Sequence, residues 1–179
     1  GYSGTSMEAI AEAAPVSKPT LYNHFKSKEE LFAAVIAAQC QSLLTTFSDV
    51  HTEYSNPVVG LTAIAESFAD LVYANESIQL YRLIIAEQRQ GAELGELLYR
   101  GGPEPILQQL SAYLAELHAK GILNAKDIDS SSRLFLDMLK GDQHLRCVLG
   151  LQIGLSDTEK QRLIETVVSL FLKGHGYEA

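Results

Sequence analysis

Apolar residues along the chain recur every three or four positions, the spacing that places side chains on one face of an α-helix. Met7, Ile10, Ala11 and Ala14 begin this pattern, and it continues to the end of the sequence. No stretch shows the strict apolar–polar alternation of a half-buried strand. We therefore predict an all-α protein of eight or nine helices, with a small unit of three before a larger bundle. The predicted helices cover residues 5–14, 17–25, 27–47, 57–73, 77–91, 103–121, 127–150 and 156–174.

Capping residues set the predicted starts of the helices. Thr5 and Glu8 have the spacing of a capping box at the start of the first helix. Ser17 is expected to cap the second helix, where Val16 and Leu21 have the spacing of a hydrophobic staple. Further starts are predicted at Ser27 with Glu30, Pro57, Ser77, Pro103 with Pro105, Asp127 or Asp129, and Ser156 with Glu159.

Composition and charge limit the classes of function. With 179 residues, 46% of them hydrophobic, the chain is long enough to bury a sizeable core. Its net charge of −8 argues against indiscriminate coating of nucleic acid, which needs a broadly basic surface. Residues 1–30 hold three lysines against four glutamates, a net charge of −1, so a locally basic element would be confined to Lys18, Lys26 and Lys28.

The cysteines and one uncharged stretch bear on the cellular context. Cys40 and Cys147 lie far apart, without the spacing of a CxxC or Cys/His metal site, so we predict reduced thiols, a cytoplasmic location, and no metal or cofactor. Residues 31–48 carry no charged side chain, which is compatible with a membrane span. Polar residues such as Gln39 and Thr45 interrupt the apolar run, so we favour a buried amphipathic helix and no membrane association.

The first two predicted helices have the layout of a helix-turn-helix, two short helices joined by three or four residues. On a helical wheel of the second helix, Leu21 and Phe25 point inward together. The opposite face offers hydroxyl, amide, imidazole and apolar groups, which suit phosphates, base edges and thymine methyl groups. The alternative is an ordinary solvated helix face. The residues on this face and its flanks are Lys18, Pro19, Thr20, Tyr22, Asn23 and His24.

Lys28 stands at the first position of the third predicted helix, where the helix dipole disfavours a cation by roughly 0.3–1 kcal/mol. A phosphate at this helix end would be held by the lysine and by free backbone N–H groups together. We therefore assign Lys28 to a phosphate contact. The alternative is a solvated lysine whose charge is offset by Glu29 and Glu30.

The segments "GTSMEAIAEAA" and "VSKPTLYNHFKSKEELF" closely resemble the DNA-binding region of the TetR family of bacterial transcriptional regulators. The resemblance covers about the first forty residues, and its most specific part is the run LYNHFKSKEEL. It implies that the exposed face of residues 18–24 reads DNA, that Lys28 contacts a phosphate, and that Thr5 or Ser6 contributes less firmly. We accordingly predict a DNA-binding domain with its connecting helix over residues 1–47.

The remaining residues, 48–179, look like the ligand-binding and dimerisation domain of the same family. The segments "YRLIIAEQRQGAELGELLY" and "LRCVLGLQIG…VVSLFLKG" resemble an AcrR/AefR-like subgroup. The resemblance implies a repressor that binds double-stranded operator DNA as a homodimer and is released by a small-molecule inducer. It does not imply which molecule.

The chain departs from the family pattern in two places. The family normally has a helix before the Gly-Thr-Ser segment, and this sequence begins at Gly1 without it, so the helix is either outside the sequence or missing. The turn of the helix-turn-helix usually has glycine where this chain has Pro15. If residue 15 must take a positive φ, the ring prevents it, and the second helix must tilt or loosen its first turn. Because the Val16–Leu21 staple and the Ser17 cap do not depend on residue 15, we favour instead a turn compatible with the proline φ near −65°.

The last predicted helix is apolar nearly all round, so it must be covered on more than one side. Together with the helix over residues 128–149 it is predicted to form a four-helix dimer interface, since reading a palindrome requires two-fold symmetry. The alternative is a central helix of a monomeric bundle. The interface residues predicted on this helix are Leu163, Val167, Leu170 and Phe171.

Aromatic side chains with a few polar groups are typical of small-ligand pockets, and the larger part of the chain supplies both. Each residue taken singly is also a normal core residue, and His118 has an alternative as an exposed histidine near a helix end. The predicted ligand-binding residues are Phe68, Tyr73, Tyr81, Glu87, Tyr113, His118 and Met138.

Three classes of function are compatible with these observations to different degrees. We favour a ligand-responsive DNA-binding repressor. The alternative is a small-molecule-binding or adaptor protein without sequence-specific DNA binding, which Pro15 and the acidic charge would favour. An enzyme is disfavoured, because the sequence has no nucleophile elbow, metal-spaced His/Cys set or Gly-rich phosphate loop.

Overall fold

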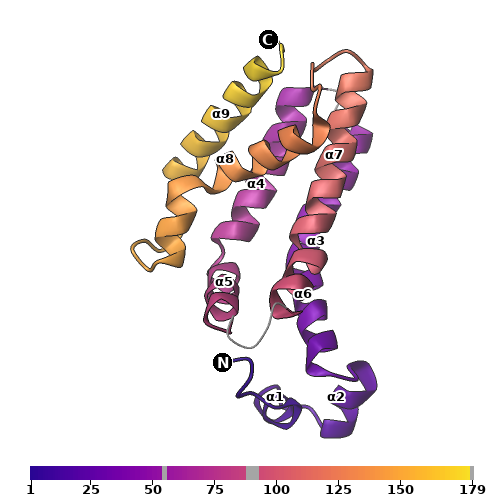
Figure 1. Cartoon of the computed structure of the whole chain (residues 1–179), viewed down its shortest axis with the longest axis vertical. Coiled ribbons are helices and arrows are strands. Elements are labelled where there is room, and N and C mark those ends of the chain that lie inside the picture. Colours follow the sequence, from indigo (N-terminus) through magenta and orange to yellow (C-terminus); the bar gives the residue numbers. More distant parts are fainter. Residues whose placement is uncertain (54–55, 88–92, 178–179) are drawn as a thin grey trace.

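The computed structural model describes residues 1–53, 56–87 and 93–177, and within these ranges the chain forms helices and no strand. The all-α prediction is therefore confirmed. A small unit lies at one end of the molecule and a larger helical body at the other, with one long helix reaching from one into the other (Figure 1). The small unit comprises α1 (Met7–Ala13), α2 (Lys18–His24) and the start of α3 (Lys28–Glu53). The larger body comprises α4 (Pro57–Tyr73), α5 (Asn75–Glu87), α6 (Glu93–Gly101), α7 (Pro103–Ala119), α8 (Ile128–Val148) and α9 (Asp157–Gly174).

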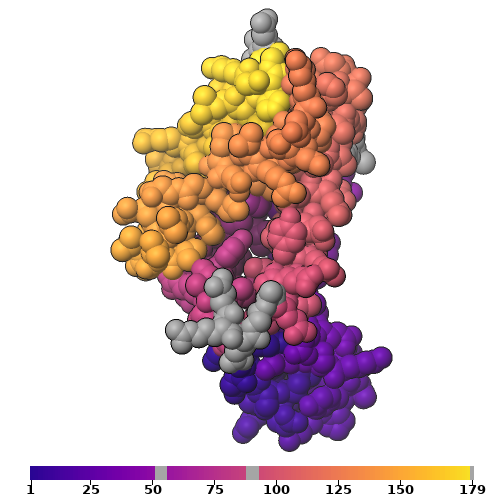
Figure 2. Space-filling model, in the orientation of Figure 1, coloured from indigo at the N-terminus to yellow at the C-terminus, as the bar shows by residue number. Residues whose placement is uncertain are grey.

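The small unit, which we call the head, has its own apolar cluster. Met7, Ala11 and Leu21 are buried in it, and Leu31 of α3 packs against it from the other side of the head. The space-filling view shows the head as a separate lobe below the body (Figure 2). Because so few side chains form this cluster, the position of α2 depends strongly on the short turn that precedes it.

Local hydrogen bonds confirm one predicted cap and correct another. The Ser17 hydroxyl accepts from the Thr20 backbone N–H at 3.2 Å, as expected for the cap of α2. At α1 the cap is Ser6, whose hydroxyl accepts from Ala9 N–H at 3.1 Å, whereas Thr5 lies one residue too early. The predicted staple is also wrong, because Val16 is 40% exposed and does not belong to the apolar cluster of the head.

The turn between α1 and α2 has a geometry that favours glycine. The Val16 N–H donates to Ala11 O at 3.1 Å, which is the long bond of a Schellman motif and places residue 15 where the backbone takes a positive φ. Pro15 has a φ of 22°, far from the value near −65° that its ring favours. The expectation of a proline-compatible turn is therefore wrong, because the packing of the two helices dictates the turn and the ring is strained to fit it.

The core of the larger body is formed mainly by α3, α4, α7, α8 and α9. By length and composition, residues 28–50 of α3 could cross a membrane, a test that core helices of globular proteins also pass. Here Ile36, Leu43, Phe47 and Val50 are at most 1% exposed and pack in the core. The sequence pattern predicts an apolar face through Leu31, Ala34, Val35 and Ala38. This is wrong, because Val35 is 44% exposed and Ala38 is also exposed, whereas Phe32, Ile36 and Cys40 face the core.

Several helix boundaries differ from the predictions. Helix α4 matches, Asp127 caps α8, and Ser156 forms the predicted capping box with Glu159. Helix α5 begins at Asn75 instead of Ser77, and residues 88–91 of that predicted helix lie outside the described ranges. Helix α6 was not predicted as a separate element, and α8 is kinked at Gly141, with φ 50° and ψ −153°.

Candidate nucleic-acid interface and ligand pocket

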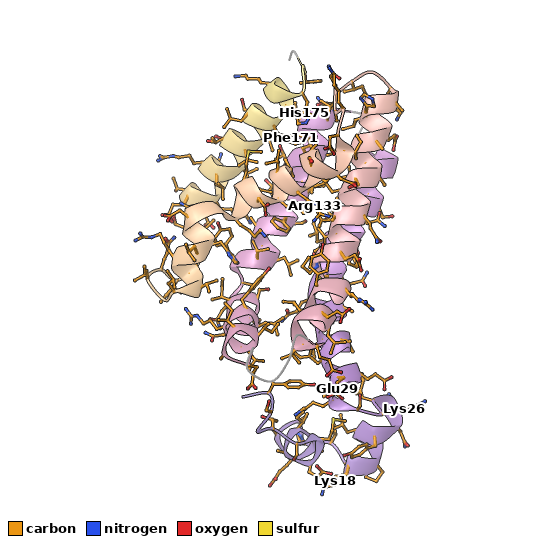
Figure 3. The ribbon with its side chains drawn as sticks, in the orientation of Figure 1. Lys18, Lys26, Glu29, Arg133, Phe171 and His175 are labelled. Atoms are coloured by element: carbon orange, nitrogen blue, oxygen red, sulfur yellow. The ribbon has the colours of Figure 1, made fainter. Side chains whose placement is uncertain are left out.

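One face of α2 is open to solvent along its whole length. Leu21 is 7% exposed and holds the helix to the head cluster, while the residues of the opposite face are all exposed. A proline in the first turn costs no helical hydrogen bond, because N–H groups there have no partner within the helix. The exposed residues of α2 are Lys18, Pro19, Thr20, Tyr22, Asn23 and His24. Lys18 and the nearby Lys26 both lie on the head (Figure 3).

Two side chains of this face are already hydrogen-bonded within the head. The Thr20 and Ser17 hydroxyl oxygens lie 2.7 Å apart. The Tyr22 hydroxyl donates to the Glu8 carboxylate at 3.2 Å. Partial burial and this hydrogen bond raise the pKa of Tyr22, whereas a backbone hydrogen bond and Tyr22 lower the pKa of Glu8. Glu8 therefore stays ionised at neutral pH and holds the Tyr22 ring in one position against α1.

Lys28, at the first position of α3, holds the segment that precedes α1. Its ammonium donates to Tyr2 O at 2.7 Å and to Thr5 O at 2.9 Å, and it lies 4.2 Å from the centroid of the Tyr2 ring. A lysine ammonium has three N–H donors, so these bonds leave one for a phosphate. Thr5 itself donates its hydroxyl to Gly1 O at 2.9 Å. The phosphate roles of Lys28 and Thr5 stay predictions.

The same N-terminal segment contacts both the head and the larger body. The Tyr2 hydroxyl donates to Glu29 at 3.0 Å, and its ring packs edge-on against Phe32 at a centroid distance of 5.4 Å. Burial together with the Glu29 carboxylate raises the pKa of Tyr2 to about 12. The Ser3 hydroxyl donates to the Glu87 carboxylate at 2.6 Å, at the C-terminal end of α5. Glu87 therefore joins the body to the head and does not line the main cavity described next.

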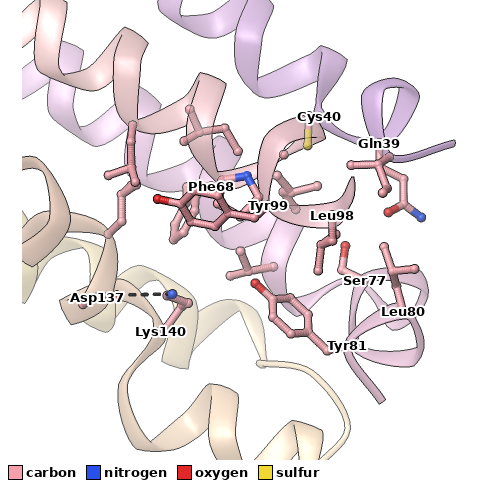
Figure 4. Close-up of a pocket in the computed structure, with 18 of the residues that line it drawn as sticks. Gln39, Cys40, Phe68, Ser77, Leu80, Tyr81, Leu98, Tyr99, Asp137 and Lys140 are labelled. Carbon is pink, nitrogen blue, oxygen red and sulfur yellow. Dashed lines mark ion pairs between the residues drawn. The ribbon is translucent and has the colours of Figure 1, made fainter. Parts of the chain in front are cut away.

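The larger body contains a cavity between α3, α4, α5, α6, α7 and α8, with about 920 Å³ of space including its mouth (Figure 4). Two of the predicted ligand-binding residues, Phe68 and Tyr81, line it. Its wall is mostly aliphatic and aromatic, which suits an apolar ligand. Burial raises the pKa of the Cys40 thiol, another lining group, so this thiol stays protonated at neutral pH. The main apolar contributors are Ile36, Phe68, Leu71, Leu80, Ile106 and Leu136.

Polar groups at the cavity come mainly from residues that the sequence analysis missed. Tyr99 is supplied by α6, and α8 supplies Arg133, Asp137 and Lys140. The Lys140 ammonium lies 3.2 Å from the Asp137 carboxylate. The three charged residues recur on α8 at intervals of four and three, which places them on one face of a helix. That spacing is the sequence signal for a charged face on this helix. The pocket prediction rests on aromatic residues and therefore does not include it.

The other predicted ligand-binding residues lie outside this cavity. The Tyr73 hydroxyl donates to Leu139 O and Lys140 O, at 3.0 and 2.7 Å, and so stabilises the α4–α8 contact. His118 Nδ1 lies 3.1 Å from Leu123 O near the end of α7. Two further residues, Tyr113 and Met138, belong to or pack against the hydrophobic core. The structure thus assembles a pocket from only part of the predicted set.

The four residues predicted for a dimer interface separate into buried and exposed ones. Val167 and Phe171 are buried in the core of the protomer, and Leu163 packs against that core. The Phe171 ring packs edge-on against Phe135 at a centroid distance of 4.9 Å. Leu170 points outward and is 59% exposed. Other exposed apolar side chains on α8, α9 and the loop between them are Leu134, Leu145, Leu149, Leu151 and Ile153.

Within the described ranges, no group of three or more His, Cys, Asp and Glu side chains could hold a metal ion. The chemical features of the molecule are thus a solvent-exposed polar helix face on the head and an apolar cavity with a few charged groups in the body. The first suits the reading of base edges and phosphates, and the second suits a small apolar molecule.

Comparison with known proteins adds two family matches and several relatives. Residues 1–35 match the tetR family of bacterial regulatory proteins, and residues 59–177 match the C-terminal domain of AefR-like transcriptional repressors. The transcriptional activator FasR of Mycolicibacterium smegmatis is 37% identical over 84 residues, which are 47% of this chain and only 37% of FasR. The regulator UidR of Escherichia coli K12 is 28% identical over 147 residues, 79% of this chain and 70% of UidR.

Solved structures show the same architecture over nearly the whole chain. The flavonoid-responsive regulator FrrA is 34% identical with a TM-score of 0.72, covering 97% of this chain and 88% of FrrA. A TetR-family regulator from Mesorhizobium loti is 29% identical with a TM-score of 0.80, again covering 97% and 88%. Members of this family bind operator DNA, dimerise and bind small molecules, and they are generally not enzymes. The chain therefore belongs to the TetR family of bacterial transcriptional regulators, with an AefR-like C-terminal domain.

Proposed function

We propose that this protein is a ligand-responsive repressor that binds a palindromic operator as a homodimer and is released by a small hydrophobic molecule. It acts in the cytoplasm, with residues 1–47 as the DNA-binding domain and residues 48–179 as the ligand-binding and dimerisation domain. The observation that carries the proposal is that α3 runs as one helix from the head into the larger body. Its Leu31 packs against the head cluster, and its Ile36, Gln39 and Cys40 line the cavity of the body.

This continuity provides a route from ligand to DNA. A helix of 26 residues is about 39 Å long and moves largely as one body, so a displacement at the cavity reaches the head. The ligand must bind the released form more tightly than the DNA-bound form, because equal affinity for both would change nothing. Release in our proposal therefore arises when ligand in the cavity shifts α3 and changes the separation of the two α2 helices in the dimer.

The exposed apolar side chains of α8 and α9 support the dimer. Helix α9 lies on the side of the body away from α3 and α7, and α8 crosses from α7 toward α9 (Figure 1). Leu134, Leu145 and Leu170 are each more than half exposed, so these two helices have apolar side chains available for a protein–protein contact. In a two-fold dimer the two α2 helices would lie about one turn of DNA apart, roughly 34–36 Å, or about two turns if two dimers share one longer site.

The cavity and one relative support a hydrophobic inducer. The wall of the cavity is apolar and includes the rings of Phe68, Tyr81 and Tyr99. FrrA is named a flavonoid-responsive regulator and is 34% identical to this chain. We infer that the inducer here is also an aromatic or otherwise hydrophobic small molecule.

The proposal is tested by selecting bound DNA from a random pool, using a full-length protein that includes any helix before residue 1. We expect an enriched inverted repeat, and expression of a reporter behind that repeat should fall when the protein is present. A pool without an enriched sequence would instead favour the alternative, a small-molecule-binding or adaptor protein. An increase in reporter expression would show activation, the activity for which FasR is named.

A further inference from the structure

The mouth of the cavity is bounded by a tyrosine and an arginine from different helices. Tyr99 of α6 and Arg133 of α8 both line the main cavity, and with Leu107 they also line a neighbouring polar groove. The Tyr99 hydroxyl lies near the Arg133 guanidinium and, together with Asp129 and Asp137, raises its pKa further above its usual range. A molecule that enters the cavity from the groove must therefore pass this pair.

The charges around the cavity leave Arg133 as its available cation. Lys140 is paired with Asp137 at 3.2 Å, so these two charges largely offset each other. In the part of the chain that the structure describes, Arg133 has no carboxylate oxygen within 4.0 Å, although Asp129 and Asp137 are near enough to favour its charged form. Its neighbour in the cavity lining is the neutral phenol of Tyr99.

A guanidinium that lies beside a phenol oxygen will bind an anionic oxygen more strongly. An anionic acceptor adds an opposite charge to the bond, and the planar fork of an arginine can donate two parallel bonds to a carboxylate. The rest of the cavity offers aliphatic and aromatic surface, including Ile36, Phe68 and Leu136. The cavity and its mouth thus match an apolar body that carries one acidic group.

We propose that the inducer is an acidic aromatic molecule, whose carboxylate or phenolate oxygen binds Arg133 and takes the place that the Tyr99 hydroxyl occupies in this structure. This inference rests on the proposed function, because it concerns the ligand of the same regulatory cavity. It adds a consequence for regulation. Tyr99 belongs to α6, and α6 packs closely on α3, where a Cβ added to Gly101 would lie 3.1 Å from Ile36 Cγ2. Release of Tyr99 therefore frees α6 to move against the helix that leads to the head.

The experiment uses three probes of similar size that differ in charge: naphthalene-2-carboxylate, naphthalene-2-carboxamide and 2-(aminomethyl)naphthalene. Their affinities are measured by titration calorimetry on the full chain without DNA. We expect the carboxylate to bind about tenfold more tightly than the carboxamide, because only the carboxylate forms an ion pair with two parallel hydrogen bonds to the guanidinium. The ammonium compound should bind most weakly, because its charge repels Arg133.

Substitutions of Arg133 and of Tyr99 should change the affinity for the carboxylate in opposite directions. Arg133→Met should reduce carboxylate affinity about tenfold, to the level of the carboxamide, and Arg133→Lys should restore only part of it because the fork is lost. Tyr99→Phe should raise carboxylate affinity severalfold, because the competing hydroxyl is gone. Arg100→Met is the matched control. It removes an equally cationic side chain that is paired with Glu96 outside the cavity, and it should change nothing.

Several outcomes would overturn the inference: no binding of the carboxylate, no preference for it over the carboxamide, an unchanged affinity in Arg133→Met, or a weaker one in Tyr99→Phe. Operator affinity is measured separately, with and without the carboxylate. Binding that depends on Arg133 but leaves operator affinity unchanged would overturn ligand release while the inference about the ligand stands. If all three probes release the protein from operator DNA regardless of their charge, the inference about an acidic ligand is overturned, while ligand-induced release stands.

Discussion

Replacing Pro15 with glycine should stabilise the protein, although glycine ordinarily makes an unfolded chain more flexible. In the structure, residue 15 follows α1 at the position of a Schellman motif that takes a positive φ, and Pro15 has a φ of 22°. Glycine adopts such values without steric cost, whereas a proline ring favours φ near −65°. Proline also lacks the N–H that this position normally donates to the carbonyl of residue 12.

The expected gain follows from three terms. A residue held in a sparsely populated backbone region costs about 1–3 kcal/mol, which Pro15→Gly would recover. The restored N–H can form the second Schellman hydrogen bond, worth about 0.5–1.5 kcal/mol. Against these, the more flexible unfolded chain of the glycine variant costs about 0.4–1 kcal/mol. We expect a net increase in the free energy of unfolding of about 1–3 kcal/mol, or about 2–4 °C in Tm for each kcal/mol in a chain of this length.

Urea unfolding followed by circular dichroism measures this difference directly. Pro15→Ala is the matched control, because alanine supplies the N–H but its Cβ is disfavoured at positive φ by about 1–2 kcal/mol. It should therefore lie below glycine. Pro57→Ala tests the general effect of removing a proline, since Pro57 opens α4 in a position that suits it. A Pro15→Gly variant no more stable than the parent would refute the argument that the turn strains the ring.

Changes at four further residues test other parts of the structure. Lys28→Ala should weaken binding to all DNA sequences alike and lower the slope of log affinity against log salt by about one, and an unchanged slope in anisotropy titrations would exclude the phosphate contact. Leu170→Glu should dissociate the dimer in sedimentation while leaving protomer stability nearly unchanged, because this side chain is 59% exposed. Phe171→Glu, by contrast, should unfold the protomer, at a cost of at least about 3–5 kcal/mol, and a folded monomer would contradict the packing described. Burial, and then the charge of Lys140, lower the pKa of His144 in the folded protein. Below a pH of about 6.5 the unfolded state therefore gains the proton first, and the free energy of unfolding should fall as the pH drops. The same pH series on His144→Gln should give a shallower loss.

Much of the fold could be predicted because it depends on local interactions. A cap involves residues three positions apart, so Ser17, Asp127 and Ser156 identify helix starts without knowledge of the rest of the molecule. The apolar run of α3 identifies a helix but not the face that the core covers, because apolar residues such as Val35 and Ile36 lie on different sides of it. The face of α2 that is predicted to read DNA lies within a single short helix, and the structure leaves its residues exposed.

The cavity and the turn were decided by packing between distant segments. Tyr99 and Arg133 are 34 positions apart, and no local pattern shows that α6 and α8 bring them together at one mouth. Phe171 is as apolar as its exposed neighbour Leu170, and only the position of Phe135 on α8 decides which of the two is buried. At Pro15 the local preference of the ring is known, yet the packing of α1 against α2 overrides it. Local sequence thus determined where helices form. The contacts between helices determined which apolar and charged groups meet, because those contacts depend on the whole chain at once.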